Sequence, residues 1–444
     1  MIRRAREYFE NGLSEDIITS CLNEHLKKIP RLKKLEDYYK GNHIIKKRIV
    51  EGVCAPNNKL VNNYAKYITD VLSGHLTGNA ISYTSDEDLK IIIDIANKIG
   101  LDAHDAGLEK TLSIYGTGYE IVYMNEGTDI KITTLDPKTT FVVYDETVEC
   151  NSLFAINYMI TNDEQGQFKG YYINVYTAEN IITYFSNNLD RLEYIKEEPH
   201  IFERVPITQF LNNDEEMGDF EGVISLIDAY NVLQSDRIND KERFVDAILL
   251  LTGADLEDEN TLKHLKDNRV MSLPEGARAE YLAKTLDESQ TQVLSNAVKE
   301  DIHKFSHTPD FSDEKFSGNA SGVAMEFKLL SMENLCKIKE RLFKKGIRRR
   351  LKLIGKFASI KGGKEIDTSL IEITMSRTLP VNDLELAQTL NNLTDLVASE
   401  TLLAQLPFVK DPKKECEKLK KEKAENENNL LNKMAEPSFN KIGG

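Results

Sequence analysis

The sequence predicts an α+β protein that is mainly helical and carries one antiparallel β meander. Two stretches, residues 218–246 and 287–357, place apolar residues at the three- and four-residue spacings of helices. Between residues 118 and 185 the spacing changes to two, and short runs rich in β-branched and aromatic residues alternate with turn signals. We therefore expect a meander with helical regions before and after it along the chain.

Bulk composition bounds the class of protein. A chain of 444 residues is long enough for two to four domains. The formal net charge of −15 argues against a protein whose whole surface grips nucleic acid, because phosphate contacts require clustered Lys and Arg. The same charge is compatible with a protein that lets DNA slide past.

Cysteines and apolar runs indicate the compartment. The five cysteines never form a CxxC pair, which argues against structural zinc and against a disulfide framework. They are Cys21, Cys54, Cys150, Cys336 and Cys416. The N-terminus lacks the apolar part of a secretory signal, and the longest apolar run, residues 247–251, is too short to span a bilayer. We expect a cytosolic protein without a membrane segment.

The N-terminal part is predicted to be helical and then extended. Residues 13–40 have helical spacing, with an interruption at Pro30 and a stop at Gly41. Further helices are expected at residues 62–72, 86–99 and 103–115. Gly116 and Gly118 indicate an ordinary turn between helix and strand. The strands of the meander are expected at residues 120–124, 130–135, 140–144, 153–160 and 170–176.

Residues 218–284 are predicted to leave the body of the protein. The first half of the helix at 218–246 has an apolar stripe, whereas residues 234–243 hold a single apolar residue. A helix with so little to bury is expected to stand in solvent or against a neighbouring chain. The following module is expected to contain a strand at 247–252, a short helix at 260–266 and a hairpin around 274–276.

A second helix is predicted to bring the chain back. Capping boxes start at Thr285 and Asp287, and Pro309 disfavours helical geometry in the residue before it. The apolar stripe between them consists of Leu294, Val298, Ile302 and Phe305. Residues 309–321 are rich in turn formers and form a loop.

A long helix follows this loop. It starts near Ser321, a suitable N-cap, and continues toward Phe357, which gives a length of about 50 Å. A strand at 370–375, a helical region at 380–406 and a solvated helix from residue 410 complete the chain.

The sequence contains no nucleotide-binding, metalloprotease or hydrolase motif. One bare pattern fits metal-dependent nucleases, in which Asp310 and Glu326 would hold Mg²⁺ and Lys328 would steady the attacking water. Those nucleases place the second half of the pattern on a strand, whereas here it lies in a strongly helical stretch. We therefore expect no enzymatic activity, no cofactor and no metal site.

Two other groups of residues have a functional and an ordinary interpretation. His303 and His307, beside Asp301, could ligate a metal, but histidines are also favoured at a helix C-terminus. The basic run at residues 337–352 could contact phosphates or an acidic partner. It could equally be a solvated helix face that is paired with acidic groups of its own or of a neighbouring chain.

Seven short segments occur in a characteristic order and are spread over most of the chain. They are residues 38–45, 56–68, 74–83, 135–137, 313–324, 377–382 and 399–401. Their order resembles the portal proteins of tailed bacteriophages, specifically the SPP1-type portal family. The resemblance implies a mainly helical portal fold and a ring of about twelve identical subunits around a DNA channel.

The resemblance also divides the chain into regions. They are the wing at 1–217, the outgoing stem helix at 218–245, the clip at 246–284, the returning stem helix at 285–308, the tunnel loop at 309–321, the long wing helix and strand at 322–375, and the crown with the C-terminal tail at 376–444. No ATP site is present, so a separate motor must supply the energy for DNA movement.

The implied function is to conduct double-stranded DNA into and out of a capsid at one vertex of the virion. The implied partners are the terminase large subunit, a head–tail connector or adaptor, and the major capsid and scaffolding proteins, met in the host bacterial cytoplasm during assembly. A capsid-associated scaffold or adaptor without a channel is the alternative that remains beside the nuclease.

Two sets of site residues follow from the resemblance. The loop that faces DNA is expected to use Phe311, Ser312, Asp313, Glu314, Lys315, Phe316, Ser317, Gly318, Asn319 and Ala320. The clip that meets the terminase and the connector is expected to use Asp255, Glu257, Asp258, Lys263, Lys266, Pro274, Glu275 and Arg278. A channel for DNA of any sequence should bind phosphate weakly, because every firm contact must be broken at each step.

Overall fold

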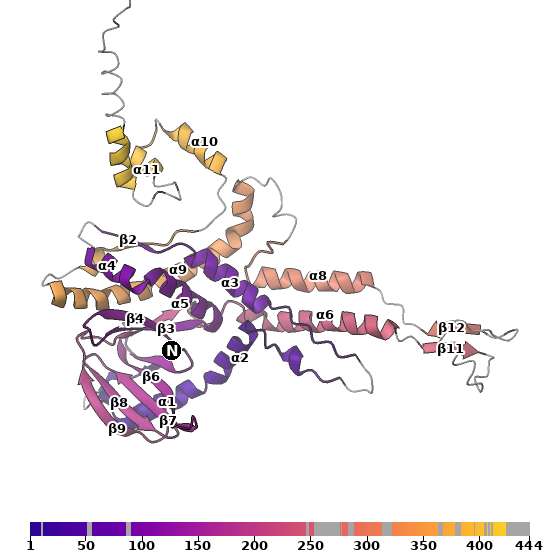
Figure 1. The fold of residues 1–444 in the computed structure, drawn as a ribbon, viewed down its shortest axis with the longest axis horizontal. Helices are drawn as coiled ribbons and strands as arrows, with labels where there is room; N and C mark the ends of the chain where they lie inside the picture. The colour runs from indigo at the N-terminus through magenta and orange to yellow at the C-terminus, as the bar shows by residue number, and fades with distance from the viewer. Residues whose placement is uncertain are drawn as a thin grey trace, which may run out of the picture. The chain divides into compact units, whose positions relative to one another are not determined.

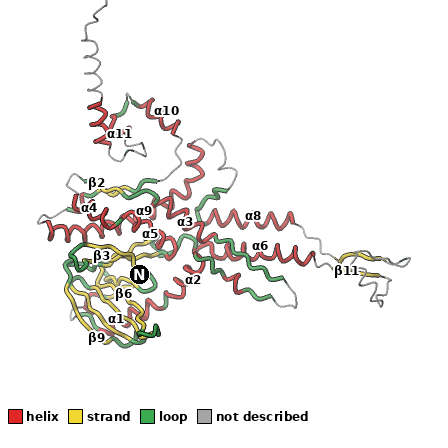
Figure 2. The backbone as a smooth tube through the Cα atoms, in the orientation of Figure 1, coloured by secondary structure: helices red, strands yellow, loops and turns green. Residues whose placement is uncertain are grey.

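The computed structural model describes most of the chain and divides it into two compact units. The described residues are 1–9, 12–50, 56–85, 90–245, 248–252, 276, 278–282, 288–312, 322–362, 367–377, 383–394, 396–403, 406, 409 and 412–422 (Figure 2). The first unit comprises Met1–Ser317 and Lys328–Thr378, and the second comprises Gly318–Phe327 and Leu379–Gly444.

The largest sheet of the first unit has six strands in the order β1-β5-β6-β7-β8-β9, of which β6 to β9 are labelled in Figure 1. The strands are β1 (Ile2–Arg4), β5 (Thr140–Asp145), β6 (Ser152–Asn162), β7 (Phe168–Tyr176), β8 (Asn180–Ser186) and β9 (Glu193–Pro199). From β5 to β9 each strand pairs antiparallel with the next, which confirms an antiparallel meander. The parallel pairing of β1 with β5 was not predicted, because a three-residue strand leaves almost no periodic signal.

The first two predicted strands belong to a different sheet. β3 (Thr117–Met124) pairs antiparallel with β4 (Ile130–Leu135) and with β10 (Ile207–Leu211). The prediction of one meander starting at residue 120 was therefore wrong at its N-terminal end. β10 comes far along the chain, so local spacing could not reveal the pairing.

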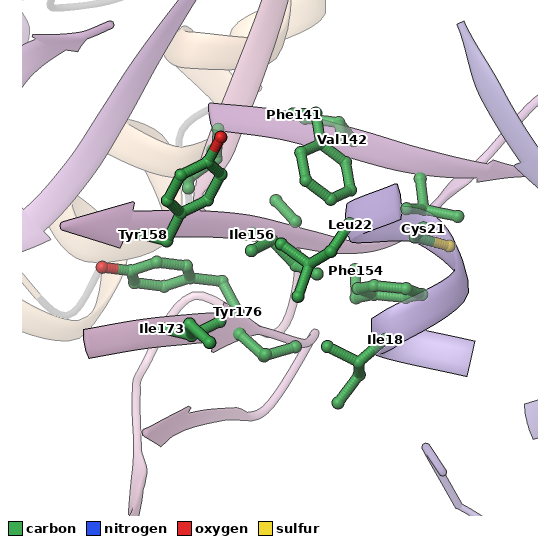
Figure 3. Packing of buried hydrophobic residues seen from close by; sticks show 14 of the residues in the cluster. Ile18, Cys21, Leu22, Phe141, Val142, Phe154, Ile156, Tyr158, Ile173 and Tyr176 are labelled. Carbon is green, nitrogen blue, oxygen red and sulfur yellow. The ribbon is translucent and has the colours of Figure 1, made fainter. Parts of the chain in front are cut away.

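The main hydrophobic core lies between the six-stranded sheet and α1 (Glu15–Leu26), as Figure 3 shows. Ile18 and Leu22 lie on one face of α1 and belong to the same buried cluster as Phe154 and Ile156 of β6. The hydroxyl of Ser14 accepts the N–H of residue 17 and so caps the start of this helix.

Four more helices complete the N-terminal part. They are α2 (Ile29–Tyr39), α3 (Tyr64–Thr77), α4 (Lys90–Ile99) and α5 (Leu101–Tyr115); short 3-10 turns lie at Arg6–Phe9 and Ile44–Lys47. Pro30 occupies the first turn of α2, where a missing N–H costs nothing, so it starts this helix. Gly116 ends α5 with φ +80°, and a Cβ atom there would lie 2.0 Å from the carbonyl oxygen of Glu216. Only glycine fits this turn.

Two helices and a pair of strands form the part predicted to leave the body. After a 3-10 turn at Glu221–Val223, α6 (Ile224–Val245) lies beside α8 (Glu288–Phe305), as Figure 1 shows. β11 (Ile248–Thr252) pairs antiparallel with β12 (Arg278–Leu282) between these helices along the chain. The predicted short helix at 260–266 lies outside the described residues.

The polar half of α6 has a partner within the chain. Asn231, Ser235 and Asn239 are buried and lie at intervals of four residues, on one face of the helix. They accept hydrogen bonds from alternate backbone N–H groups of segment 58–62, at 2.7, 3.0 and 2.8 Å. The expectation that this half stands in solvent or against a neighbouring chain was therefore wrong.

The predicted long helix is α9 (Gly322–Gly362), which has 41 residues. Its buried face includes Met332, Cys336, Phe343, Ile347, Leu351 and Ile354. A 3-10 turn at Thr368–Leu370 leads to β13 (Glu372–Thr374), which pairs antiparallel with β2 (Ser82–Thr84). This strand confirms the prediction at 370–375.

The second unit is helical where it is described. It contains α10 (Asp383–Leu393), α11 (Ser399–Leu403) and a helix over residues 412–422. These helices fall within the helical region predicted after residue 380. Across the described ranges of both units, no helix has the length and apolar character needed to cross a membrane.

Candidate functional site

The described residues cover the start of the predicted DNA-facing loop and little of the predicted clip surface. Of the loop residues, Phe311 and Ser312 are described, and both are exposed. Arg278 of the clip set is also described, and it is exposed at the start of β12. Residues 313–320 of the loop set and the seven other clip residues lie outside the described part of the chain.

Residues 308–312, which we call the loop root, are bound to α3 and α8. The hydroxyl of Tyr67 in α3 donates to the carbonyl oxygen of Pro309 at 2.9 Å and accepts the N–H of Phe311 at 3.3 Å. Lys299 of α8 forms an ion pair with Asp310 at 2.5 Å. Three consecutive residues of the root are therefore held by side chains from two helices.

Asp310 is the electrostatic centre of the loop root. Besides Lys299, its carboxylate accepts hydrogen bonds from the backbone N–H and the hydroxyl of Ser312, at 3.1 and 2.6 Å. Burial alone would raise the pKa of Asp310, but the hydrogen bonds from Lys299 and Ser312 outweigh burial and lower it to about 2. The carboxylate is therefore charged at any pH near neutrality, and its ion pair with Lys299 is retained there.

His303 fills the space between the root and α3. Its ring meets the rings of Tyr64 and Tyr67 edge-on, with centroid distances of 5.6 and 5.8 Å. Its Nδ1 donates to the carbonyl oxygen of Thr308 at 2.9 Å, and its Nε2 lies 3.8 Å from an oxygen of Asp310. This histidine is thus a packing and hydrogen-bonding residue of the loop root.

The second histidine of the predicted pair points to a different partner. His307 has φ +56°, the left-handed conformation common after a helix ends, and its Nδ1 lies 2.7 Å from the hydroxyl of Ser331 in α9. The pair at 303 and 307 is therefore divided between the loop root and α9. Within the described residues no group of three or more His, Cys, Asp or Glu side chains could hold a metal ion.

The nuclease pattern lacks the structural context that its chemistry requires. Glu326 and Lys328 lie in α9, a continuous helix, whereas the nuclease pattern needs them on a strand. Asp310 is already engaged by Lys299 and Ser312 in the loop root.

Sequence reasoning identified Asp310, His303 and His307 but assigned them other roles, and it missed Tyr67 and Lys299 altogether. Tyr67 is separated from Pro309 by 242 residues, so no local spacing connects them. The segment that contains Tyr67 resembles portal proteins, but nothing in it indicates a contact with Pro309. Its function in the root becomes visible only in the folded chain.

Buried ion pairs attach α9, the helix after the loop, to the body. Lys339 is 2% exposed and lies 2.7 Å from Glu109 of α5 and 2.6 Å from Asp219. Arg350 is fully buried and lies 2.7 Å from Glu120 of β3 and 2.6 Å from Asp105. Part of the basic run is thus paired with acidic groups of its own chain, but in the core rather than on the solvated face that its ordinary interpretation expected.

Burial alone would lower the pKa of both cations, but the neighbouring carboxylates outweigh burial and raise it. For Glu120 burial opposes ionisation, but the charge of Arg350 outweighs burial and lowers its pKa. Arg350 and Glu120 therefore remain charged, and each depends on the other inside the core.

Comparison with known proteins confirms the resemblance. A family model described as phage portal protein, SPP1 Gp6-like, matches residues 18–429. The portal protein of Bacillus phage SPP1 is 24% identical over 465 residues, which cover 97% of this chain and 91% of that protein. The portal protein of Clostridium phage phiCD119 is 21% identical over 416 residues, which cover 86% of this chain and 90% of that protein. With the family model matching nearly its whole length, this chain belongs to the SPP1 Gp6-like family of phage portal proteins.

Proposed function

We propose that this chain is the subunit of a ring at one capsid vertex through which double-stranded DNA is packaged and later ejected. The observation that carries the proposal is the path of the chain. α6 leads to the paired strands β11 and β12, α8 returns beside α6, and the loop that follows has its root bound to the body. Such a path repeated in each subunit of a closed ring would present identical loops to one central channel.

The exposed face of α8 supports assembly with identical neighbours. Val293 is 69% exposed, Leu294 53% and Phe305 59%, although all three are apolar and lie on a well-formed helix. Leu294 and Phe305, eleven residues apart, lie on the same face of the helix. Exposed apolar side chains of this kind indicate a surface that a partner covers. Head-to-tail contacts of this kind close into a ring, for which we propose about twelve subunits.

We propose the regions of the ring as follows. Residues 218–245 and 285–308 form the stem, 246–284 the clip that docks the terminase and then the connector, and 309–321 the loop that meets DNA. The wing at 1–217, its long helix and strand at 322–375 and the crown at 376–444 lie within the capsid vertex. The ring itself is not an enzyme, so the packaging motor that docks on the clip supplies the energy.

The test of the channel is removal of the loop beyond its root. Deletion of residues 313–320 should leave rings intact, because the described contacts of the root end at Ser312. DNA packaging should be lost in a complementation assay with a phage that lacks its own portal. Negative-stain electron microscopy of the same protein reports separately on ring assembly.

A matched variant replaces the same residues by glycine and serine and keeps the length of the loop. If this variant packages DNA normally, the side chains of Lys315 and Phe316 are not needed for DNA contact. The proposal of a DNA channel is unaffected by that result. Normal packaging by the deletion variant would remove the loop from the path of DNA. A wild-type protein that forms no ring at any concentration would favour a scaffold or adaptor without a channel.

A further inference from the structure

The basic run of α9 is divided into two sets by the fold. The cations that face inward or lie at the flank have partners within the chain. Lys339, Arg350 and Lys344 pair with carboxylates. Arg349 donates to the hydroxyl of Ser152 and to the carbonyl oxygen of Val205. Glu340, the one acidic residue between positions 337 and 352, also receives Arg377 at 2.6 Å. The only carboxylate of the run is therefore engaged by Lys344 and Arg377 and forms no ion pair with the remaining cations of the run.

The outward-facing cations form a separate row. They recur at intervals of three or four residues along the solvent side of α9, and every one of them is exposed; they are Lys337, Arg341, Lys345, Arg348 and Lys352. We call these residues the α9 basic row. None of its members has a salt bridge to any carboxylate in the described part of the chain. At about 1.5 Å per residue the row is about 22 Å long.

This arrangement is unfavourable for an isolated helix. Exposed helices usually alternate Lys or Arg with Glu at a spacing of four residues, and like charges at that spacing destabilise a helix. The row contains such like-charge neighbours at 337 and 341, at 341 and 345, and at 348 and 352. The net charge of the chain is −15, so the row is a local concentration of positive charge on an acidic protein. A polyanion bound along the helix would relieve the repulsion.

We propose that the α9 basic row is a site for the phosphate backbone of double-stranded DNA, separate from the channel loop. A straight row of single positive charges matches a polymer that presents single negative charges at regular intervals. Among the described residues, exposed carboxylates occur in short clusters on the sheets, such as Glu193, Glu197 and Glu198 of the edge strand β9. Ring assembly, followed in the experiment below, distinguishes such a face of a second copy from DNA.

The row should bind DNA without regard to sequence. Lys and Arg on the outside of one helix reach phosphates, whereas sequence readout requires side chains that enter a groove. Several firm phosphate contacts would oppose sliding, so this site suits DNA that lies against the protein rather than DNA that passes through a channel. The inference therefore goes beyond the channel and does not depend on it.

The test is the salt dependence of binding to a short DNA duplex of arbitrary sequence. We expect the purified full-length protein to bind a fluorescent duplex, as measured by anisotropy at several NaCl concentrations. Replacement of all members of the row by glutamine should make the slope of log K against log [NaCl] shallower by about 4.5, since each lost phosphate contact contributes about 0.9. Lys→Arg and Arg→Lys exchanges within the row should retain the slope.

A control variant carries the same change in net charge elsewhere. It replaces five exposed lysines that form no ion pair within the described part of the chain: Lys27, Lys33, Lys47, Lys98 and Lys169. Binding close to that of the wild type is expected for this control. Ring formation is followed in parallel by electron microscopy for all variants.

Three results would overturn the inference. The first is no duplex binding by the wild type, and the second is equal loss of binding by the row variant and by the control. The third is loss of rings on replacing the row, with retained rings in the control, because an acidic face of a second copy would then be the partner. None of these results affects the channel, which is tested by deletion of the loop.

Discussion

Gly346, in the middle of α9, is a residue whose lack of a side chain is required by packing. A Cβ atom there would lie 2.3 Å from two ring carbons of Phe210, which itself packs on Phe343 at a centroid distance of 5.2 Å. Gly346→Ala should therefore destabilise the protein by about 1–3 kcal/mol, although alanine is the better helix former by about 1 kcal/mol. Urea unfolding of the purified protein measures the change in the free energy of unfolding.

Gly107 provides the control for this prediction. It lies inside α5, and a Cβ atom there would meet no other atom within 4 Å. Gly107→Ala should stabilise the protein by up to about 1 kcal/mol, through helix propensity alone. Equal effects at the two positions would mean that Phe210 does not occupy the space beside α9.

Glu109 should make the stability of the protein depend on pH. Burial raises the pKa of its carboxyl from 4.5 to about 7, although Lys339 opposes the shift. Between these values the folded protein binds a proton that the unfolded chain has lost, so the free energy of unfolding falls as the pH rises across this window. Glu109→Gln removes this titration.

The variant should therefore gain about 2–3 kcal/mol relative to the wild type between about pH 5 and pH 8. Urea unfolding at several pH values gives the two curves. Parallel curves would show that Glu109 is already ionised throughout, with Lys339 dominating its environment. Asp219 remains in both proteins, so the ammonium group of Lys339 keeps one partner in the variant.

Single residues such as these could not be predicted from the sequence. Lys339 and Arg350 belong to a run of exposed-looking cations, and nothing in their spacing distinguishes them from Lys345 or Arg348. Their partners come from α5, from β3 and from the segment before α6, more than one hundred residues away. Burial of a cation is decided by where distant carboxylates fold, which composition and periodicity do not record.

At the scale of elements, the polar face of α6 should be essential for its attachment. Asn231→Ala removes the acceptor of the backbone N–H of Asn62 and a partner of the His43 ring, which lies 2.8 Å from its amide nitrogen. A buried donor left without an acceptor costs about 1–3 kcal/mol. Hydrogen exchange of segment 58–62 should accelerate in this variant.

Asn334→Ala is the matched control, because Asn334 is an exposed asparagine of a helix with no hydrogen bond in the described structure. It should leave the exchange rates unchanged and raise the free energy of unfolding by at most about 0.7 kcal/mol, because alanine is the better helix former. Unaltered exchange of segment 58–62 in Asn231→Ala would show that α6 is held to the body by its other contacts, such as that of Asn239 with Asn58.

The succession of elements was accessible from sequence, and their pairing was not. Helices with a clear apolar period, such as α9, and the strands from β5 to β7 were predicted near their observed bounds. The split into two sheets and the attachment of α6 were missed, because each depends on pairing between segments far apart in sequence. In α6 the polar residues Asn231, Ser235 and Asn239 have the same four-residue period as an apolar stripe. A prediction based on hydrophobic periodicity does not detect such a polar face.

At the scale of the whole molecule, family membership was predictable because many short segments keep one order along the chain. The family model matches the same chain from residue 18 to residue 429. The candidate site was predictable only as a stretch of residues between two helices. The contacts of Tyr67 and Lys299 with the loop root could be recognised only in the structure. The sequence of a loop does not indicate which distant side chains contact its ends.

The buried cations of α9 also restrict how this helix can move. A shift by one residue would turn each side chain by about 100° and advance it by about 1.5 Å. Lys339 and Arg350 would then leave their carboxylates and bring uncompensated charge into the core, at a cost of several kcal/mol per ion. These ion pairs therefore oppose any rotation or translation of α9 relative to the body. If α9 moves, α5 and β3 must move with it.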